Sequence, residues 1–112
     1  MKKLCVLLLL TVSLFASAKE YTFSPGDVQA MKQLLGSGNL QPGDAVVLKD
    51  GTYHNLEEIH FTGKGVSGKP IVWRAENPGK AVISGKLRLK IYGEYLQLED
   101  LLFYKAWAIG HD

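Results

Sequence analysis

The chain has 112 residues, of which 46% are hydrophobic, and its formal net charge is +2. This length leaves room for one small domain and excludes a multidomain architecture. The sequence contains a single cysteine, so an internal disulfide framework is excluded and the fold must be stabilised by packing.

Residues 1–18 have the pattern of a secretory leader. Lys2 and Lys3 precede an apolar stretch over 4–15 and three small residues, which predicts cleavage before Lys19. The apolar stretch is shorter than the roughly 20 residues that a membrane-spanning helix needs. We therefore expect an exported protein, periplasmic or secreted, without membrane attachment once the leader is removed. The mature chain would be neutral, since removing two of 13 basic residues leaves 11 against 11 acidic ones.

The segment 19–43 is expected to contain one short helix. Its start is indicated by Ser24 as N-cap, Pro25 at the first helical position and the acid of Asp27. Apolar residues follow at helical spacing, and a glycine-rich stretch over 36–39 ends the pattern. These apolar residues are Val28, Met31, Leu34 and Leu35. Because such a face needs a surface to cover, we expect the helix to cap the strands that follow.

The segment 44–112 consists of short apolar runs between turns rich in Gly, Pro, Asn and Asp, which predicts strands. Asp50 and Gly51 would also suit a tight hairpin in an antiparallel meander. The spacing favours stacked coils instead, because similar runs begin at Ala45, Ile71 and Tyr95, 26 and 24 residues apart. A second series is expected to alternate with the first, over 57–61, 81–85 and 101–105. The segment is therefore predicted to form about three coils of a β-helix.

Alternation along these strands assigns their faces. Expected to point inward are Ile59, Phe61, Leu87, Leu89, Ile91, Leu96, Leu98, Leu101 and Phe103. Expected to point outward are Glu58, His60, Arg88, Lys90 and Tyr92.

Between Lys64 and Lys90 there are seven basic residues and one acid, Glu76. A positive patch would favour a polyanion, and export makes an acidic polysaccharide a better candidate than nucleic acid. The alternative is a set of solvated turn lysines. His54 and His60 flank two glutamates, but their spacing does not indicate a metal site.

Three stretches carry a family resemblance. They are DAVVLKDGTYHN over 44–55, FTGKGVSGKPIVWRAENPGKAVISG over 61–85 and LRLKIYGEYLQLEDLLFYKA over 87–106. In this order they resemble the N-terminal coils of polysaccharide lyase family 6, which contains chondroitinase B and alginate lyases. The resemblance covers about 20–112 and implies an all-β fold, a right-handed parallel β-helix with a short N-terminal capping α-helix.

The resemblance also implies β-elimination at a uronic acid in alginate or in a dermatan- or chondroitin-type glycosaminoglycan. In the family a calcium ion neutralises the uronate carboxylate, a lysine is the proposed base, and an arginine lies beside the leaving oxygen. Those motifs lie on later coils, so no catalytic or calcium-binding residue is carried onto this chain, which is expected to be an inactive fragment truncated before them.

Weak substrate contacts are expected from Arg88, Lys90, Lys105 and Trp107. The aromatic residues of the tail could equally belong to the interior of a further coil. Two alternatives to a lyase fragment are a non-catalytic β-helical module that binds a polyanion, and a structural unit that self-associates through its open end.

Overall fold

The computed structural model describes residues 18–108, with side chains described as far as 106. The expected leader therefore lies almost wholly outside the described residues. In the part of the chain that is described, no helix is long and apolar enough to cross a membrane.

The described residues form parallel strands and one α-helix. In chain order the elements are β1 (Glu20–Phe23), the 3-10 turn η1 (Pro25–Asp27), α2 (Val28–Ser37), β2 (Ala45–Leu48), β3 (Gly51–His54), β4 (Glu57–Lys64), β5 (Ile71–Ala75), β6 (Ala81–Glu94), β7 (Leu96–Glu99) and β8 (Leu102–Ala108).

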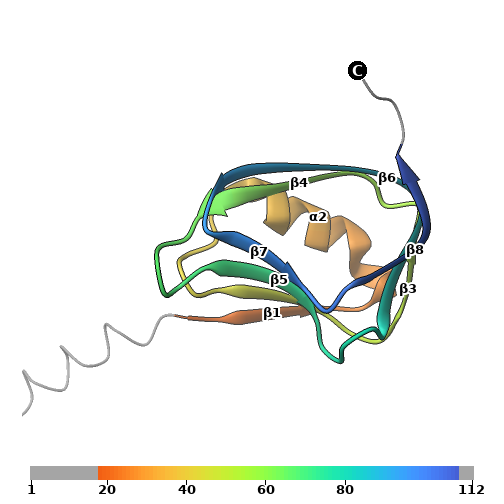
Figure 1. Ribbon diagram of the computed structural model, residues 1–112, viewed down its shortest axis with the longest axis horizontal. Helices are drawn as coiled ribbons and strands as arrows, with labels where there is room; N and C mark the ends of the chain where they lie inside the picture. The colour runs from red at the N-terminus through yellow and green to blue at the C-terminus, as the bar shows by residue number, and fades with distance from the viewer. Residues whose placement is uncertain (1–17, 109–112) are drawn as a thin grey trace, which may run out of the picture.

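The strands wind into a stack of coils with three sides. One side is the parallel sheet β1-β2-β5-β7. The long strand β6 contributes to both other sides, because its first part pairs with β3 and its second part pairs with β4. Figure 1 shows this arrangement as a ring, with β1, β5 and β7 along one side and β4 and β6 along another. The predicted parallel β-helix is confirmed.

One expected stacking is wrong. The run 57–61 does not lie beneath 81–85, because Gly51 pairs with Ala81 and Glu57 pairs with Leu87. The difference arises from β3, a four-residue strand that the sequence presents as part of a turn and in which only Tyr53 is buried.

The sheets change direction at a column of residues with positive φ. Asn55 (φ 53°), Gly85 (φ 83°) and Lys105 (φ 55°) occupy corresponding corners of successive coils. The Asn55 backbone N–H donates to Ser84 O at 2.8 Å, and its side-chain oxygen accepts from the Lys86 N–H at 2.8 Å. Asparagine and glycine suit this corner because they tolerate the left-handed conformation.

Strand β1 was not expected from the sequence, and a buried carboxylate explains its position. Asp44 is only 2% exposed and accepts hydrogen bonds from the backbone N–H groups of Lys19 at 3.0 Å and Gln41 at 2.8 Å. These bonds attach the start of β1 beside β2, where Glu20 pairs with Ala45. The segment 19–43 therefore supplies a strand as well as a helix.

The helix caps one end of the stack, as the sequence predicted. Met31 and Leu35 are fully buried, and Val28 and Leu34 pack against the same core. The Asp27 carboxylate accepts hydrogen bonds from the Ser24 backbone at 3.1 Å and hydroxyl at 2.9 Å, which stabilises the first turn. The helix ends at Ser37 and is followed by Gly38 in the left-handed conformation. In Figure 1 α2 lies across the ring, where it covers the end of the core.

The core lies inside the coils, and its exposure changes along the stack. Ile59, Phe61 and Trp73 are fully buried, with the Phe61 and Trp73 rings packed edge to face at 6.2 Å. Leu87, Leu89, Leu96, Leu98 and Leu101 are partly buried against this core, as expected. The inward-facing Ile91 and Phe103 are nevertheless 49% and 42% exposed. Phe103 pairs with the buried Ile83, so it lies on the inward side at the end of the stack opposite α2.

Candidate functional site

The outward face of β4 and β6 carries a group of polar and aromatic side chains. The register places Glu58 beside Arg88, His60 beside Lys90 and Thr62 beside Tyr92. These six residues alternate with the inward Ile59, Phe61 and Leu89, so all project from one side of the sheet. We call them the β4–β6 outer face.

One carboxylate oxygen organises this face. Glu58 Oε2 lies 3.4 Å from Lys90 Nζ, 3.4 Å from His60 Nε2 and 3.9 Å from Arg88 Nη1. Desolvation raises the pKa of Glu58, but the hydrogen bond and charge of Lys90, followed by those of His60, outweigh it and leave the pKa below its ordinary value. Glu58 is therefore ionised at neutral pH and holds the basic groups near one another.

An aromatic ring completes the face. The ring of Tyr92 lies 5.8 Å from that of His60, tilted by 42° between the ring planes, and Tyr92 is 50% exposed. A half-exposed aromatic ring beside basic groups offers an apolar surface and charge to the same ligand.

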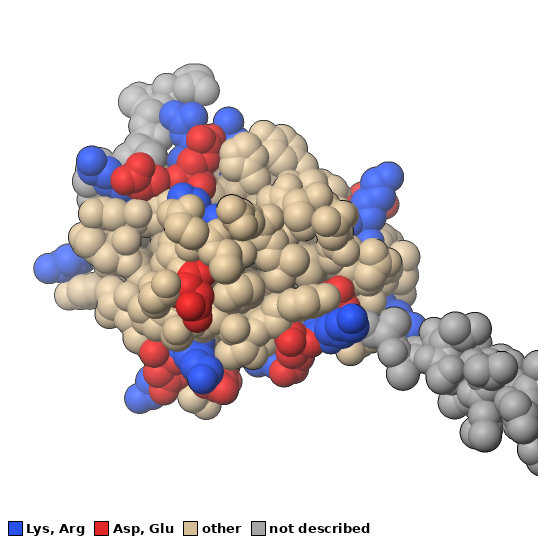
Figure 2. Space-filling view, turned by 180° about the vertical axis from the view of Figure 1, so that it is seen from behind, with Lys and Arg blue, Asp and Glu red and all other residues tan. Residues whose placement is uncertain are grey.

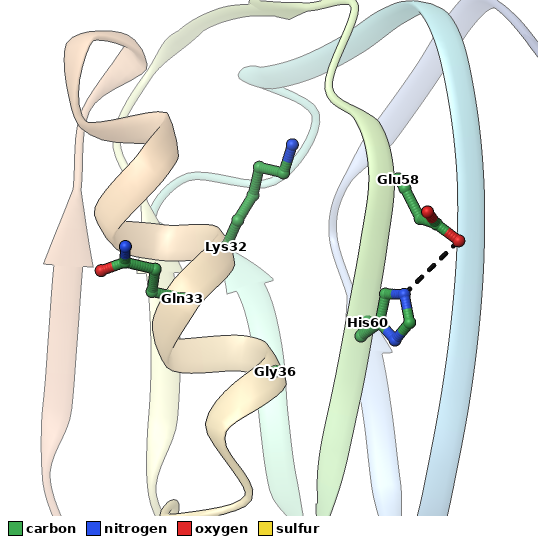
Figure 3. Close-up of a pocket in the computed structure, with 5 residues that line it drawn as sticks. All are labelled: Lys32, Gln33, Gly36, Glu58 and His60. Carbon is green, nitrogen blue, oxygen red and sulfur yellow. Dashed lines mark ion pairs between the residues drawn. The ribbon is translucent and has the colours of Figure 1, made fainter.

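A shallow groove of about 300 Å³ runs between α2 and β4 and includes part of this face. It is lined by Lys32, Gln33, Gly36, Glu58 and His60. Lys32 is fixed by donating from Nζ to Leu56 O at 2.9 Å. Figure 3 shows α2 beside β4, with Glu58 and His60 extending from β4 on the side away from the helix and toward the neighbouring strand. The groove and the β4–β6 outer face are thus continuous through Glu58 and His60.

The structure brings together two of the four predicted substrate contacts. Arg88 and Lys90 meet at Glu58. Lys105 lies on β8, where Nζ is 5.4 Å from the centre of the Tyr104 ring, and it is not part of the group around Glu58. The Trp107 side chain lies outside the described residues. Sequence alternation placed Glu58, His60 and Tyr92 outward, but it gave no register to show that they lie beside Arg88 and Lys90.

The basic residues between Lys64 and Lys90 do not form one patch. Arg74 lies on β5 and pairs with Glu20 at 2.8 Å, whereas Arg88 and Lys90 lie on β6 around Glu58. Lys69 and Lys80 lie in the turns that flank β5. Figure 2 shows Lys and Arg interspersed with Asp and Glu over one face of the molecule. The two possibilities left open by the sequence are thereby narrowed: these residues do not form a single patch, because consecutive strands of a coil lie on different sides of the stack.

Acidic and histidine side chains do not converge on a metal-binding arrangement in the described part of the chain. Within residues 18–108, no group of three or more His, Cys, Asp or Glu is placed to hold an ion. His54 instead contacts Ser84 Oγ through Nδ1 at 2.9 Å, and His60 contacts Glu58.

Comparisons with known proteins give a consistent result. A family model described as Chondroitinase B matches residues 28–109. A solved mannuronic acid specific polysaccharide family 6 lyase from human gut microbiota has 96% identity and a TM-score of 0.83 over 84% of this chain and 21% of that chain. No curated protein matches the chain.

More distant solved structures have the same fold. The PL6 family alginate lyase AlyGC has 27% identity and a TM-score of 0.65 over 81% of this chain and 12% of that chain. The PL6 family polysaccharide lyase Pedsa3628 from Pseudopedobacter saltans has 27% identity and a TM-score of 0.65 over 77% of this chain and 19% of that chain. The chain thus spans about a fifth or less of the length of these relatives.

Proposed function

The chain belongs to the chondroitinase B family, as its sequence motifs implied, and on this premise we propose that it forms the capped end of a lyase that cleaves mannuronate-containing polysaccharide by β-elimination. The observation that carries the proposal is the 96% identity to a mannuronic acid specific lyase over 84% of the chain. A difference of so few residues leaves the fold of this segment and its outward side chains largely unchanged.

The chemistry explains why the chain by itself is assigned a scaffold role. β-Elimination removes the proton from C5 of the uronate, and the neighbouring carboxylate opposes the negative charge that develops. A complete site needs a base, a group that protonates the leaving oxygen and a means of neutralising the carboxylate. We assign no described residue to these steps, because the family resemblance implies that the base and the group beside the leaving oxygen lie on later coils.

Calcium is the ion that the family resemblance implies for the complete lyase, where it would neutralise the uronate carboxylate. Residues 18–108 contain no group of His, Cys, Asp or Glu that fits such an ion. We assign no described residue to this ion, and no step of our proposal passes through it.

The open end of the stack supports a scaffold role. Leu101 and Phe103 form the inward apolar row at the start of β8, in which Phe103 is 42% exposed, and such a row on a parallel strand is suited to receive another coil. In the isolated chain the same row favours self-association. We also propose that residues 1–18 direct export, so that the chain meets an acidic polysaccharide in the periplasm or outside the cell.

A segment exchange tests the proposed function. In a chimera, this chain replaces the matching segment of the mannuronic acid specific lyase, and unsaturated product is followed by its ultraviolet absorbance on mannuronate polymer. We expect the chimera to retain activity within about twofold of the parent, because the two segments are 96% identical. A twofold difference in rate corresponds to under about 0.5 kcal/mol. The purified chain is the matched control and should give no unsaturated product. An inactive but folded chimera, or turnover by the chain alone, would contradict the proposal.

A further inference from the structure

We propose that the β4–β6 outer face and the adjoining α2 groove form a binding subsite for a uronate-containing saccharide chain. The inference rests on the proposed function for the class of ligand, an acidic polysaccharide.

The charge balance of the face favours an anion. Glu58 is the carboxylate at which Lys90, Arg88 and His60 meet, so two permanent cations and one imidazole share a single negative charge. The next register pair along the strands, Lys64 and Glu94, is neutral in sum. Lys32 in the groove adds a further positive charge. A uronate carboxylate would therefore meet a net positive site with donors already close to one another.

The surface also suits a sugar ring. Tyr92 exposes half of its side chain beside His60, and a pyranose can place its apolar face on such a ring. Thr62, opposite Tyr92, and Gln33 in the groove supply neutral hydrogen-bonding groups for hydroxyls. Aromatic, amide, hydroxyl and basic groups thus lie on one continuous surface.

The coil spacing fits a chain that runs along the stack. Adjacent strands lie about 4.8 Å apart, close to the length that one pyranose adds to a 1,4-linked polysaccharide. A saccharide laid from β4 to β6 would meet one strand for each successive sugar. Glu58 and His60 lie at the centre of this path, because they belong to both the groove and the outer face.

Calorimetric titration of the purified chain with mannuronic acid tetrasaccharide tests the subsite, with a neutral mannose tetrasaccharide as the matched ligand. We expect the acidic ligand to bind and the neutral one to bind at least about tenfold more weakly. Added salt should raise the dissociation constant of the acidic ligand. Lys90→Gln should raise the dissociation constant about fivefold, and Lys90→Arg should keep it within about twofold of the parent value. Tyr92→Ala should raise it about fivefold through the lost ring surface.

Two control variants match these changes elsewhere on the surface. Lys80→Gln removes an equal charge from an exposed turn, and Tyr104→Ala removes a half-exposed ring from β8. Both should leave the dissociation constant within about twofold of the parent. The subsite is overturned if the chain does not bind the acidic tetrasaccharide, if the neutral ligand binds equally well, or if the control variants weaken binding as much as Lys90→Gln and Tyr92→Ala. Failure of the lyase chimera would reject the proposed function alone, since this titration involves no cleavage.

Discussion

The capping role of α2 predicts a large loss of stability from one substitution, Leu35→Ala. The Leu35 side chain is fully buried in the core beneath the helix, and truncation removes three of its carbon atoms. The neighbouring strand limits how far the helix can move inward, since a Cβ added at Gly36 would already touch His60 O at 3.5 Å. A buried leucine truncated in a site that cannot collapse costs about 3 kcal/mol. That is a large fraction of the stability of a small domain.

Urea unfolding followed by circular dichroism measures this cost. With a slope of about 1.5 kcal/mol per molar urea for a chain of this size, the midpoint should fall by about 2 M. Leu34→Ala is the matched control on the same helix, because Leu34 is only partly buried, and it should cost about 1 kcal/mol. Equal and small effects of the two substitutions would show that α2 does not cap the core. A change in slope rather than midpoint would also refute the reasoning.

Two further predictions concern the corners and the buried tyrosine. Gly85→Ala should lower the free energy of unfolding by about 3 kcal/mol, because the new Cβ would collide with the Asn55 side chain in addition to the strain of a positive φ. Gly79→Ala is the control, since Gly79 has φ 75° with open space around it, and it should lower that free energy by only about 1 kcal/mol. Equal urea midpoints for the two variants would exclude the collision. Burial, followed by the charge of nearby acids, raises the pKa of Tyr53 to about 12, and its hydroxyl donates to Lys49 O at 2.7 Å. The unfolded chain, with the ordinary tyrosine pKa of about 10, loses this proton first, so stability should fall as pH rises from about 10 to 12. Tyr53→Phe should flatten this decline relative to the parent in melting experiments across that range, and an unchanged slope would contradict the assignment.

Several parts of the fold follow from local rules and were predicted from the sequence. The helix over 28–37 is determined by its start signal, its apolar spacing and Gly38, all of which lie within a few turns of one another. The inward positions of Ile59, Phe61 and Leu87 follow from alternation, which depends only on the extended backbone. The sequence motifs also determined the family, which the match over 28–109 bears out.

Other parts depend on pairing between distant segments and were not predicted. β1 is attached through Asp44, a contact that spans 25 residues, and β3 has too few apolar residues to resemble a strand. The turns between coils differ in length, so the paired residues Ala45 and Val72 are 27 apart while Glu57 and Leu87 are 30 apart. A single period read from the sequence therefore cannot give the register on every side.

In the candidate site too, some features follow from local sequence and others from pairing between distant segments. The sequence by itself determined which side chains face outward, because a strand alternates its faces whatever it pairs with. It also predicted Arg88 and Lys90 as ligand contacts. Only the tertiary structure decided that Glu58 and His60 lie beside them, because strand pairing brings together residues that are 30 positions apart. The same pairing separated Arg74 from Arg88 and placed them on different sides of the stack, because a strand and its successor lie on different sides of each coil.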